Sequence, residues 1–256
     1  MGRGAAAPLA GLAGMSGATH PGAAASYAAR IAHHVPSLHD MHRMAGILLA
    51  EHVPENGRVL VLGAGGGLEL RAFAQAYSGW RFDGVDPSPA MIGQARDTLG
   101  QDSDRVTFHQ GYIDDAPKGP FDGATCLLTL HFLSQDERLR TLRELHRRLR
   151  PAAPFVMAHH SFPLTGGQQD LWLRRNAAWL IAEGTPEAQA MAGISSIKEQ
   201  LPVLPPEEDE LLLTTAGFRD IQLFYAAFTF KGWVARACQP GDLQSSMRHG
   251  HVPLTT

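Results

Sequence analysis

The fold is decided by the stretch Val59-Leu-Val-Leu-Gly63-Ala-Gly65-Gly-Gly67, together with Asp86 at the end of the next apolar run. A short, β-branched apolar run is typical of a strand buried on both faces. Glycines directly after such a strand let the backbone approach a ligand that a Cβ would obstruct. An acidic residue about 20 positions further on can accept hydrogen bonds from both hydroxyls of a ribose. The stretch therefore predicts a nucleoside site at the carboxyl ends of parallel strands.

The spacing of the glycines bears on which nucleoside is bound. A dinucleotide-binding fingerprint has the form G-x-G-x-x-G, and its last glycine would fall on Leu68. The spacing here is G-x-G-x-G at Gly63, Gly65 and Gly67. A nicotinamide-dependent oxidoreductase stays an alternative, but the spacing disfavours it.

Outward from this stretch, apolar runs alternate with helical patterns. Strands are predicted at 58–63, 80–85, 106–111, 121–129 and 155–159, and helices at 26–35, 37–52, 68–77, 88–99 and 135–149. Further helices are predicted at 168–183, at 186–191 and from Pro205 to Gly217, followed by two hairpin strands at 218–225 and 228–235. This order predicts an α/β fold whose parallel strands are joined by right-handed crossovers.

A longer string makes the assignment more specific. The segment Gly84-Val-Asp86-Pro-Ser-Pro-Ala-Met91-Ile-Gly-Gln-Ala-Arg96 resembles a motif of class I methyltransferases that depend on S-adenosylmethionine (SAM), of the type 12-like group. The third-strand run 106–113, the fourth-strand exit 129–133 and the final hairpin are similar to the same family, so the resemblance covers about 27–237. It implies a Rossmann-like three-layer sandwich with a seven-stranded, mostly parallel sheet and an antiparallel final strand.

The resemblance also implies the cofactor, SAM, and the residues that contact it. These are Tyr27, Arg30, Gly63, Ala64, Gly65, Gly67, Asp86, Pro87, Met91, Tyr112, Ile113, Leu128 and His131. Asp86 would bind the ribose, while Met91, Tyr112 and Ile113 would border the adenine. Met91 could equally fill the core, and Tyr112 and Ile113 could be ordinary packing at a strand end.

Two stretches, 27–36 and 128–133, resemble the carboxy-SAM synthase branch, in which the N-terminal helix closes over the cofactor. By that resemblance Tyr27 and Arg30 reach the methionine carboxylate. Carboxy-SAM synthases carry an arginine about 24 residues before the final Gly-Phe pair, and here that count reaches Ile194. Ordinary methyl transfer is therefore favoured.

The sequence departs from the family pattern at two places. The acidic residue usual two positions before the first glycine is Val61 here, and Glu69 is the nearest acid along the chain. The acidic residue usual after the third-strand glycine is Tyr112, so Asp114 is either the displaced acid or a turn cap.

Candidate catalytic residues are His131, His159 and His160, which follow the fourth and fifth strands. Imidazole titrates near neutrality and can take a proton from a nucleophile. For His131 the alternative is a helix-start histidine bonded to the backbone. The histidines show no spacing with carboxylates that predicts a metal site.

The helical region at about 165–205 is expected to form a lid over the acceptor. Trp172 and Trp179 lie on one helix face there, either as core or as a surface that stacks on the substrate. The arginines at 138, 140, 143, 147 and 148 are expected on a solvated helix face.

The net charge and the cysteine content limit the classes of partner and the compartment that the sequence predicts. The 256 residues carry a net charge of −3 and two cysteines, Cys126 and Cys238, which favours a reducing cytoplasm and gives no global attraction to nucleic acid. No apolar run approaches a membrane span. We expect a flexible arm at 1–25, a single domain at 26–237 and a flexible tail at 238–256.

The sequence thus predicts a SAM-dependent methyltransferase that acts on a small molecule. A SAM-binding protein without turnover and a SAM-modifying enzyme similar to carboxy-SAM synthase remain alternatives. The oligomeric state, monomer or homodimer, stays open, as do the acceptor and the atom methylated.

Overall fold

The structure is a computed structural model that describes residues 31–238. The arm expected at 1–25 lies outside the described residues, and so does the tail expected at 238–256 apart from its first residue. So do Tyr27 and Arg30.

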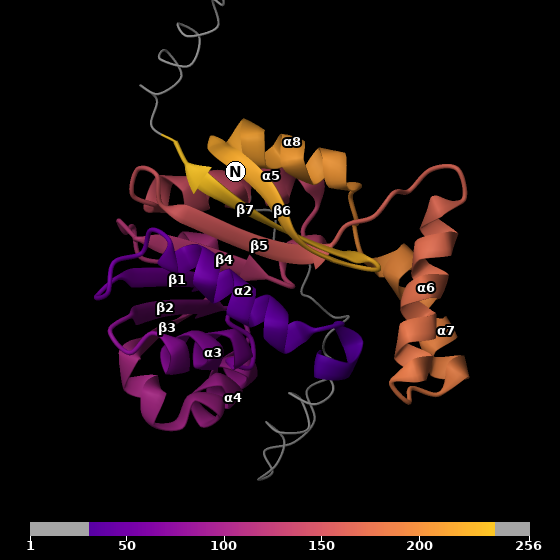
Figure 1. The fold of residues 1–256 in the computed structure, drawn as a ribbon, viewed down its shortest axis with the longest axis horizontal. Helices are drawn as coiled ribbons and strands as arrows, with labels where there is room; N and C mark the ends of the chain where they lie inside the picture. Colours follow the sequence, from indigo (N-terminus) through magenta and orange to yellow (C-terminus); the bar gives the residue numbers. More distant parts are fainter. Residues whose placement is uncertain (1–30, 239–256) are drawn as a thin grey trace, which may run out of the picture.

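The centre of the molecule is a seven-stranded sheet of order β3-β2-β1-β4-β5-β7-β6 (Figure 1). Its strands are β1 (Arg58–Leu62), β2 (Arg81–Asp86), β3 (Val106–Gln110), β4 (Gly123–Leu127), β5 (Pro154–His160), β6 (Phe218–Ala227) and β7 (Phe230–Ala237). The first five strands are parallel to one another, and β7 runs antiparallel to both β5 and β6. The predicted seven-stranded, mostly parallel sheet is confirmed, with its antiparallel end formed by the last hairpin.

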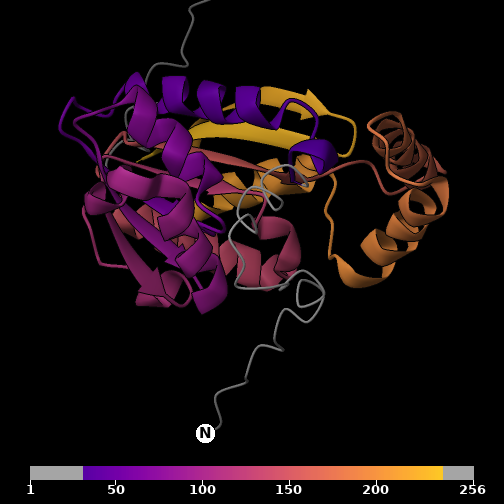
Figure 2. The ribbon, with the colours of Figure 1, turned by 90° about the horizontal axis from the view of Figure 1, so that it is seen from below.

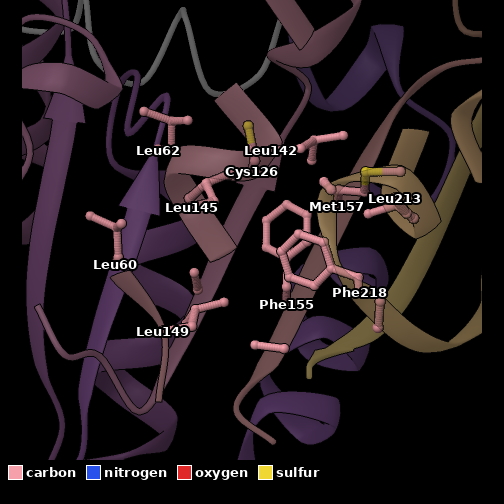
Figure 3. Close-up of a cluster of buried hydrophobic side chains, with 14 of the residues drawn as sticks. Leu60, Leu62, Cys126, Leu142, Leu145, Leu149, Phe155, Met157, Leu213 and Phe218 are labelled. Atoms are coloured by element: carbon pink, nitrogen blue, oxygen red, sulfur yellow. The ribbon is translucent and has the colours of Figure 1, made fainter. Parts of the chain in front are cut away.

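Helices cover both faces of the sheet because alternate strand residues point to opposite sides. The helices α2 (Leu38–Ala50), α3 (Leu68–Ala76) and α4 (Pro89–Leu99) bury one face together with Val59 and Val61. The helices α5 (Gln135–Arg148) and α8 (Pro206–Ala216) bury the other with Leu60 and Leu62. Figure 3 shows the second core, where Phe155 and Phe218 stack with ring centroids 5.0 Å apart.

Between β5 and α8 the chain forms a helical insert of α6 (Gln168–Ala182) and α7 (Glu187–Gln200). Figures 1 and 2 show this pair beyond the carboxyl end of β5, apart from the layers that cover the sheet. The second insert helix was predicted to end at 191, and it continues for more than two further turns. Its apolar residues Ile194 and Ile197 pack on the insert's own small core, which supports the extra turns.

One expectation about α5 is wrong. Arg138 and Arg148 were placed on a solvated face, but Arg138 is fully buried and Arg148 nearly so. Arg138 is covered by α8, where it pairs with Asp209, and Arg148 pairs with Glu144 one turn back along its own helix. Arg138 lies on the same helical face as Leu142 and Leu145, and α8 covers that face from far along the chain.

The buried face of α2 carries a titratable residue, His42. Burial, and then the charge of His39, lowers the pKa of His42 from 6.5 to about 4. Between these values the unfolded chain binds a proton that the folded chain does not. The free energy of unfolding should therefore fall by up to about 1.4 kcal/mol per pH unit as the pH drops from about 6.5 to 4.5 because of this residue. Urea unfolding of His42→Leu beside the parent should show a shallower acid slope in the variant; equal slopes would contradict the assignment.

Candidate functional site

The glycine turn predicted to approach a ligand lies between β1 and α3, at the carboxyl edge of the sheet. Gly63, Gly65 and Gly67 have φ angles of 78°, 47° and 82°, a region that residues with a Cβ rarely adopt. The N–H groups of Gly63 and Ala64 both donate to the Val85 carbonyl, at 2.8 and 3.0 Å. These bonds hold the turn against the end of β2, where Asp86 follows.

Asp86 is the best-defined polar group at this edge. Its Oδ2 accepts from the Gly65 N–H and its Oδ1 from the Ser88 N–H, both at 2.9 Å. The side chain is 8% exposed. Burial raises the pKa of Asp86, and the two backbone N–H groups oppose that rise. The carboxylate is thus fixed in direction, and each oxygen has one lone pair left for a further donor.

The end of β3 meets the same point. The Gly111 N–H donates to the Asp86 carbonyl at 3.0 Å, which brings Tyr112 and Ile113 to the same edge of the sheet as Asp86. Tyr112 is 44% exposed while Ile113 is buried. Tyr112 is therefore the more accessible of the two, and Ile113 belongs to the core beneath α5 and α8.

The two acidic residues that follow Tyr112, Asp114 and Asp115, both have hydrogen-bond partners. The Asp114 carboxylate binds Arg140 through both oxygens, at 2.8 and 3.0 Å, on the surface. The neighbouring Asp115 accepts from the Tyr112 N–H at 2.9 Å and so caps the turn. Of the two sequence alternatives for Asp114, the turn cap is filled by Asp115 instead.

The exit of β4 carries the only positive-φ residue at the ends of the parallel strands that is not glycine, among residues 31–238. This is Leu128, with φ of 58° and its N–H bonded to the Ala158 carbonyl. Such a conformation costs about 1–3 kcal/mol and is often found at functional sites. The next residue, Thr129, lies against the glycine turn, since a Cβ on Gly63 would come within 2.0 Å of Thr129 Oγ1. The exits of β1 and β4 are therefore in contact.

His131 lies in the short 3-10 helix Leu130–Phe132 that follows. Its Nδ1 accepts from the His160 backbone N–H at 3.2 Å, and the two imidazole centroids are 5.0 Å apart. Burial and then the charge of His160 hold the pKa of His131 well below 6.5. His131 is therefore a neutral ring with its Nδ1 occupied as an acceptor.

His159 and His160 point to opposite faces of β5. His160 Nδ1 lies 3.0 Å from Thr229 Oγ1, the ring stacks on Phe230 at 4.0 Å, and burial lowers its pKa to about 3. His159 is fully buried on the other face, where its Nε2 lies 3.1 Å from Asp209 Oδ2. The structure thus brings His131 and His160 together and turns His159 toward α5 and α8.

The insert meets the start of the described chain. The Trp179 indole N–H donates to the His33 carbonyl at 3.1 Å, and Glu183 lies 3.5 Å from the His33 imidazole. Two cationic groups lie over the Trp172 ring, Arg175 Cζ at 4.6 Å and Lys231 Nζ at 5.0 Å from its centroid. Both tryptophans are partly buried, so each combines packing with an accessible edge.

The sequence did not predict that several polar residues near these elements are buried. They are Glu69, Thr125, Arg138, Asn176, Asp209 and Thr229. The available signal was a polar residue inside an otherwise apolar strand or helix face, as at Thr125 in β4. Such a residue must find a hydrogen-bond partner once it is buried.

The described part of the chain holds neither a metal-binding cluster nor a membrane-spanning helix. Across 31–238, no three His, Cys, Asp or Glu side chains gather in a way that could hold a metal ion. Within the same span, every helix is too short or too polar to cross a membrane.

Comparison with known proteins agrees with this architecture. Residues 59–152 match the family model described as "Methyltransferase domain". The carboxy-SAM synthase of Chromohalobacter salexigens is 24% identical over 206 residues, which cover 78% of this chain and 76% of the relative. That of Staphylococcus epidermidis is 21% identical and covers 78% of this chain and 88% of the relative.

Among solved structures, human N-acetylserotonin methyltransferase in complex with SAM superposes with a TM-score of 0.54 at 15% identity. The match covers 79% of this chain but only 54% of that one, so the chain spans little more than half the length of this structural neighbour. At this identity the likeness speaks for the fold. The family model at residues 59–152, the curated relatives and the fold thus agree that the chain is similar to class I SAM-dependent methyltransferases.

Proposed function

We propose that this chain binds SAM at the carboxyl edge of β1, β2 and β4 and transfers its methyl group to a small-molecule acceptor. The observation that carries the proposal is the Asp86 carboxylate, held by the Gly65 and Ser88 N–H groups with a free lone pair on each oxygen. That arrangement suits the two neighbouring hydroxyls of a ribose. The positive-φ turn beside it keeps side chains out of the ligand's path.

The remaining contacts follow from the same placement. Pro87, Met91, Tyr112 and Ile113 would border the adenine, the turn residues Gly63, Ala64, Gly65 and Gly67 would pass under the ribose and sulfur, and Leu128 and His131 would border the methionine end. Tyr27 and Arg30 would close over the carboxylate.

When bound, SAM supplies a methyl group on a sulfonium, which a nucleophile displaces in line. The chain's own work is then to position the two reactants and to exclude water. The insert of α6 and α7 lies beyond the end of β5, where it would select the acceptor. The net charge of −3 supports a small molecule over a nucleic acid.

His131 would act as a hydrogen-bond donor toward the acceptor. Because its Nδ1 accepts from the His160 N–H, the neutral ring carries its proton on Nε2. A ring whose pKa lies well below 6.5 is a weak base at neutral pH. The site therefore favours acceptors that are already nucleophilic, such as carboxylates or ionised hydroxyls, over those that must lose a proton to His131.

The tautomer can be measured without knowing the acceptor. Long-range ¹H–¹⁵N NMR spectra should show His131 as the neutral Nε2–H form, and it should stay neutral as the pH falls to about 5.5, one unit below the usual histidine pKa. The spectrum of His131→Gln assigns the signal. A ring that titrates near 6.5, or that carries its proton on Nδ1, would contradict the donor role.

Turnover is tested by the release of S-adenosylhomocysteine from SAM in the presence of small carboxylates, phenols, amines and thiols. Product formation with a carboxylate or phenol is the expected result. SAM binding without turnover across the whole panel would favour the non-catalytic alternative.

The curated relatives favour one second candidate, a SAM-modifying enzyme similar to carboxy-SAM synthase. Ile194, at the position counted for the carboxylate-binding arginine, packs among apolar residues of the insert. This speaks against a carboxylated cofactor. Mass spectrometry of SAM recovered after incubation with the protein and small carboxylic acids decides the point, because carboxylation replaces one hydrogen of SAM with a carboxyl group and so adds the mass of CO2.

A further inference from the structure

Glu69 is a buried carboxyl that the assignments above do not use. It lies in the first turn of α3, directly after the glycine turn, and is 6% exposed. Its Oε1 accepts a short hydrogen bond from Thr125 Oγ1 on β4. Among residues 31–238, Thr125 is its one hydrogen-bond partner, and no lysine, arginine or histidine lies within ion-pair distance.

Burial disfavours the ionised form of this carboxyl, and a cation bound beside it would favour that form. Burial raises the pKa of Glu69 from 4.5 to about 8, and the single hydroxyl bond only partly opposes that rise. A carboxylate can accept about four hydrogen bonds, and Glu69 receives one. Buried acids held away from their ordinary pKa cluster at functional sites.

The sheet order places Glu69 opposite Asp86 across the ligand edge. Asp86 ends β2, on one side of β1, while Thr125 lies in β4, on the other side. Thr125 is the register partner of Val61, and both side chains face the α3 layer. A ligand whose ribose is held at Asp86 and which extends over the turn toward β4 brings its far end to the Glu69 side.

We propose that the Glu69 carboxylate receives the α-ammonium group of SAM, and so supplies from helix α3 the negative charge that β1 lacks at Val61. The inference rests on the proposed function, because it concerns the same cofactor site. Glu69 is then a binding residue for the amino-acid end, as Asp86 is for the nucleoside end. The Thr125 hydroxyl orients its carboxylate.

Three ligands separate the contributions by calorimetric titration of the full chain. SAM carries the ammonium and the sulfonium, S-adenosylhomocysteine carries the ammonium alone, and 5′-methylthioadenosine carries neither. In Glu69→Gln the affinity for the first two should fall by about 10- to 100-fold, the range for a lost charge-assisted hydrogen bond. The affinity for 5′-methylthioadenosine should not change, which also shows that the variant is folded.

Two further variants sharpen the test. Val61→Asp added to Glu69→Gln returns a carboxylate to the α3 side of β1, and it should recover part of the lost affinity for SAM. Asp97→Asn, which removes an exposed acid from α4, should leave all three affinities unchanged.

The outcomes are distinct. If Glu69→Gln binds SAM as the parent does, weakens SAM but not S-adenosylhomocysteine, or weakens 5′-methylthioadenosine equally, the assignment is overturned. If the parent itself binds none of the ligands, the proposed function fails instead.

Discussion

Replacing Asp86 with asparagine should weaken SAM binding by at least about 100-fold, or about 2.7 kcal/mol, the scale for two lost hydrogen bonds to a charged group. The amide keeps the shape of the side chain, but it has one acceptor oxygen where the carboxylate has two. Its NH2 group must then face the Gly65 or the Ser88 N–H, both of which donate to Asp86 in the parent. The ribose and the glycine turn therefore lose their common anchor.

Calorimetric titration with SAM measures this effect. Asp97→Asn on the exposed side of α4 is the matched control and should bind as the parent does. An Asp86→Asn variant with unchanged affinity would show that the ribose is held elsewhere.

The largest effect on stability is expected at Asp209. Its Oδ1 pairs with Arg138 Nη1 at 2.5 Å, and both side chains are completely buried. Asp209→Ala leaves the guanidinium without a counter-ion, so the free energy of unfolding should fall by about 3–5 kcal/mol. The Arg138 contact to the Pro202 carbonyl and the proximity of His159 to Asp209 show that the pair also joins α5 to α8 and β5.

Urea unfolding compares this variant with Glu207→Ala, an exposed acid of the same helix, which should change stability by no more than about 0.5 kcal/mol. The double variant Arg138→Leu, Asp209→Leu should be more stable than Asp209→Ala, because it leaves no buried charge. Equal losses for Asp209→Ala and Glu207→Ala would contradict the account of the pair.

Much of the fold could be predicted because its signals are local. Each pattern indicates the strand or helix in which it lies. Examples are the β-branched run before Gly63, the proline at the start of α4 and the leucines of α5. The class of sheet follows from the order of those elements. The turn at 63–67 and Asp86 could be predicted for the same reason. Glycines indicate an unusual backbone conformation, and an acidic residue directly after an apolar run indicates the end of a strand.

The buried polar groups could not be predicted because they depend on contacts between distant segments. Arg138 shares the helical face of Leu142 and Leu145, but its partner Asp209 is 71 residues away, so the sequence does not show which acid would pair with it. Glu69 is likewise 56 residues from Thr125. The direction of its side chain is set by how α3 leaves the glycine turn, which the residue pattern does not encode.

The chemical role of each histidine also could not be predicted from the sequence. Their position after β4 and β5 marked them as candidates, but their hydrogen bonds decide what each ring can do. The contact from the His160 N–H to His131 Nδ1 joins the exits of two strands, and it distinguishes a donor from a base.

The central claim is tested most directly by calorimetric titration of the full chain with SAM and with S-adenosylhomocysteine. The account predicts micromolar binding of both, one molecule per chain, with the loss described above in Asp86→Asn. Absence of binding to either ligand by the folded parent protein would contradict it, because the turn and Asp86 would then form a site that no longer holds its cofactor.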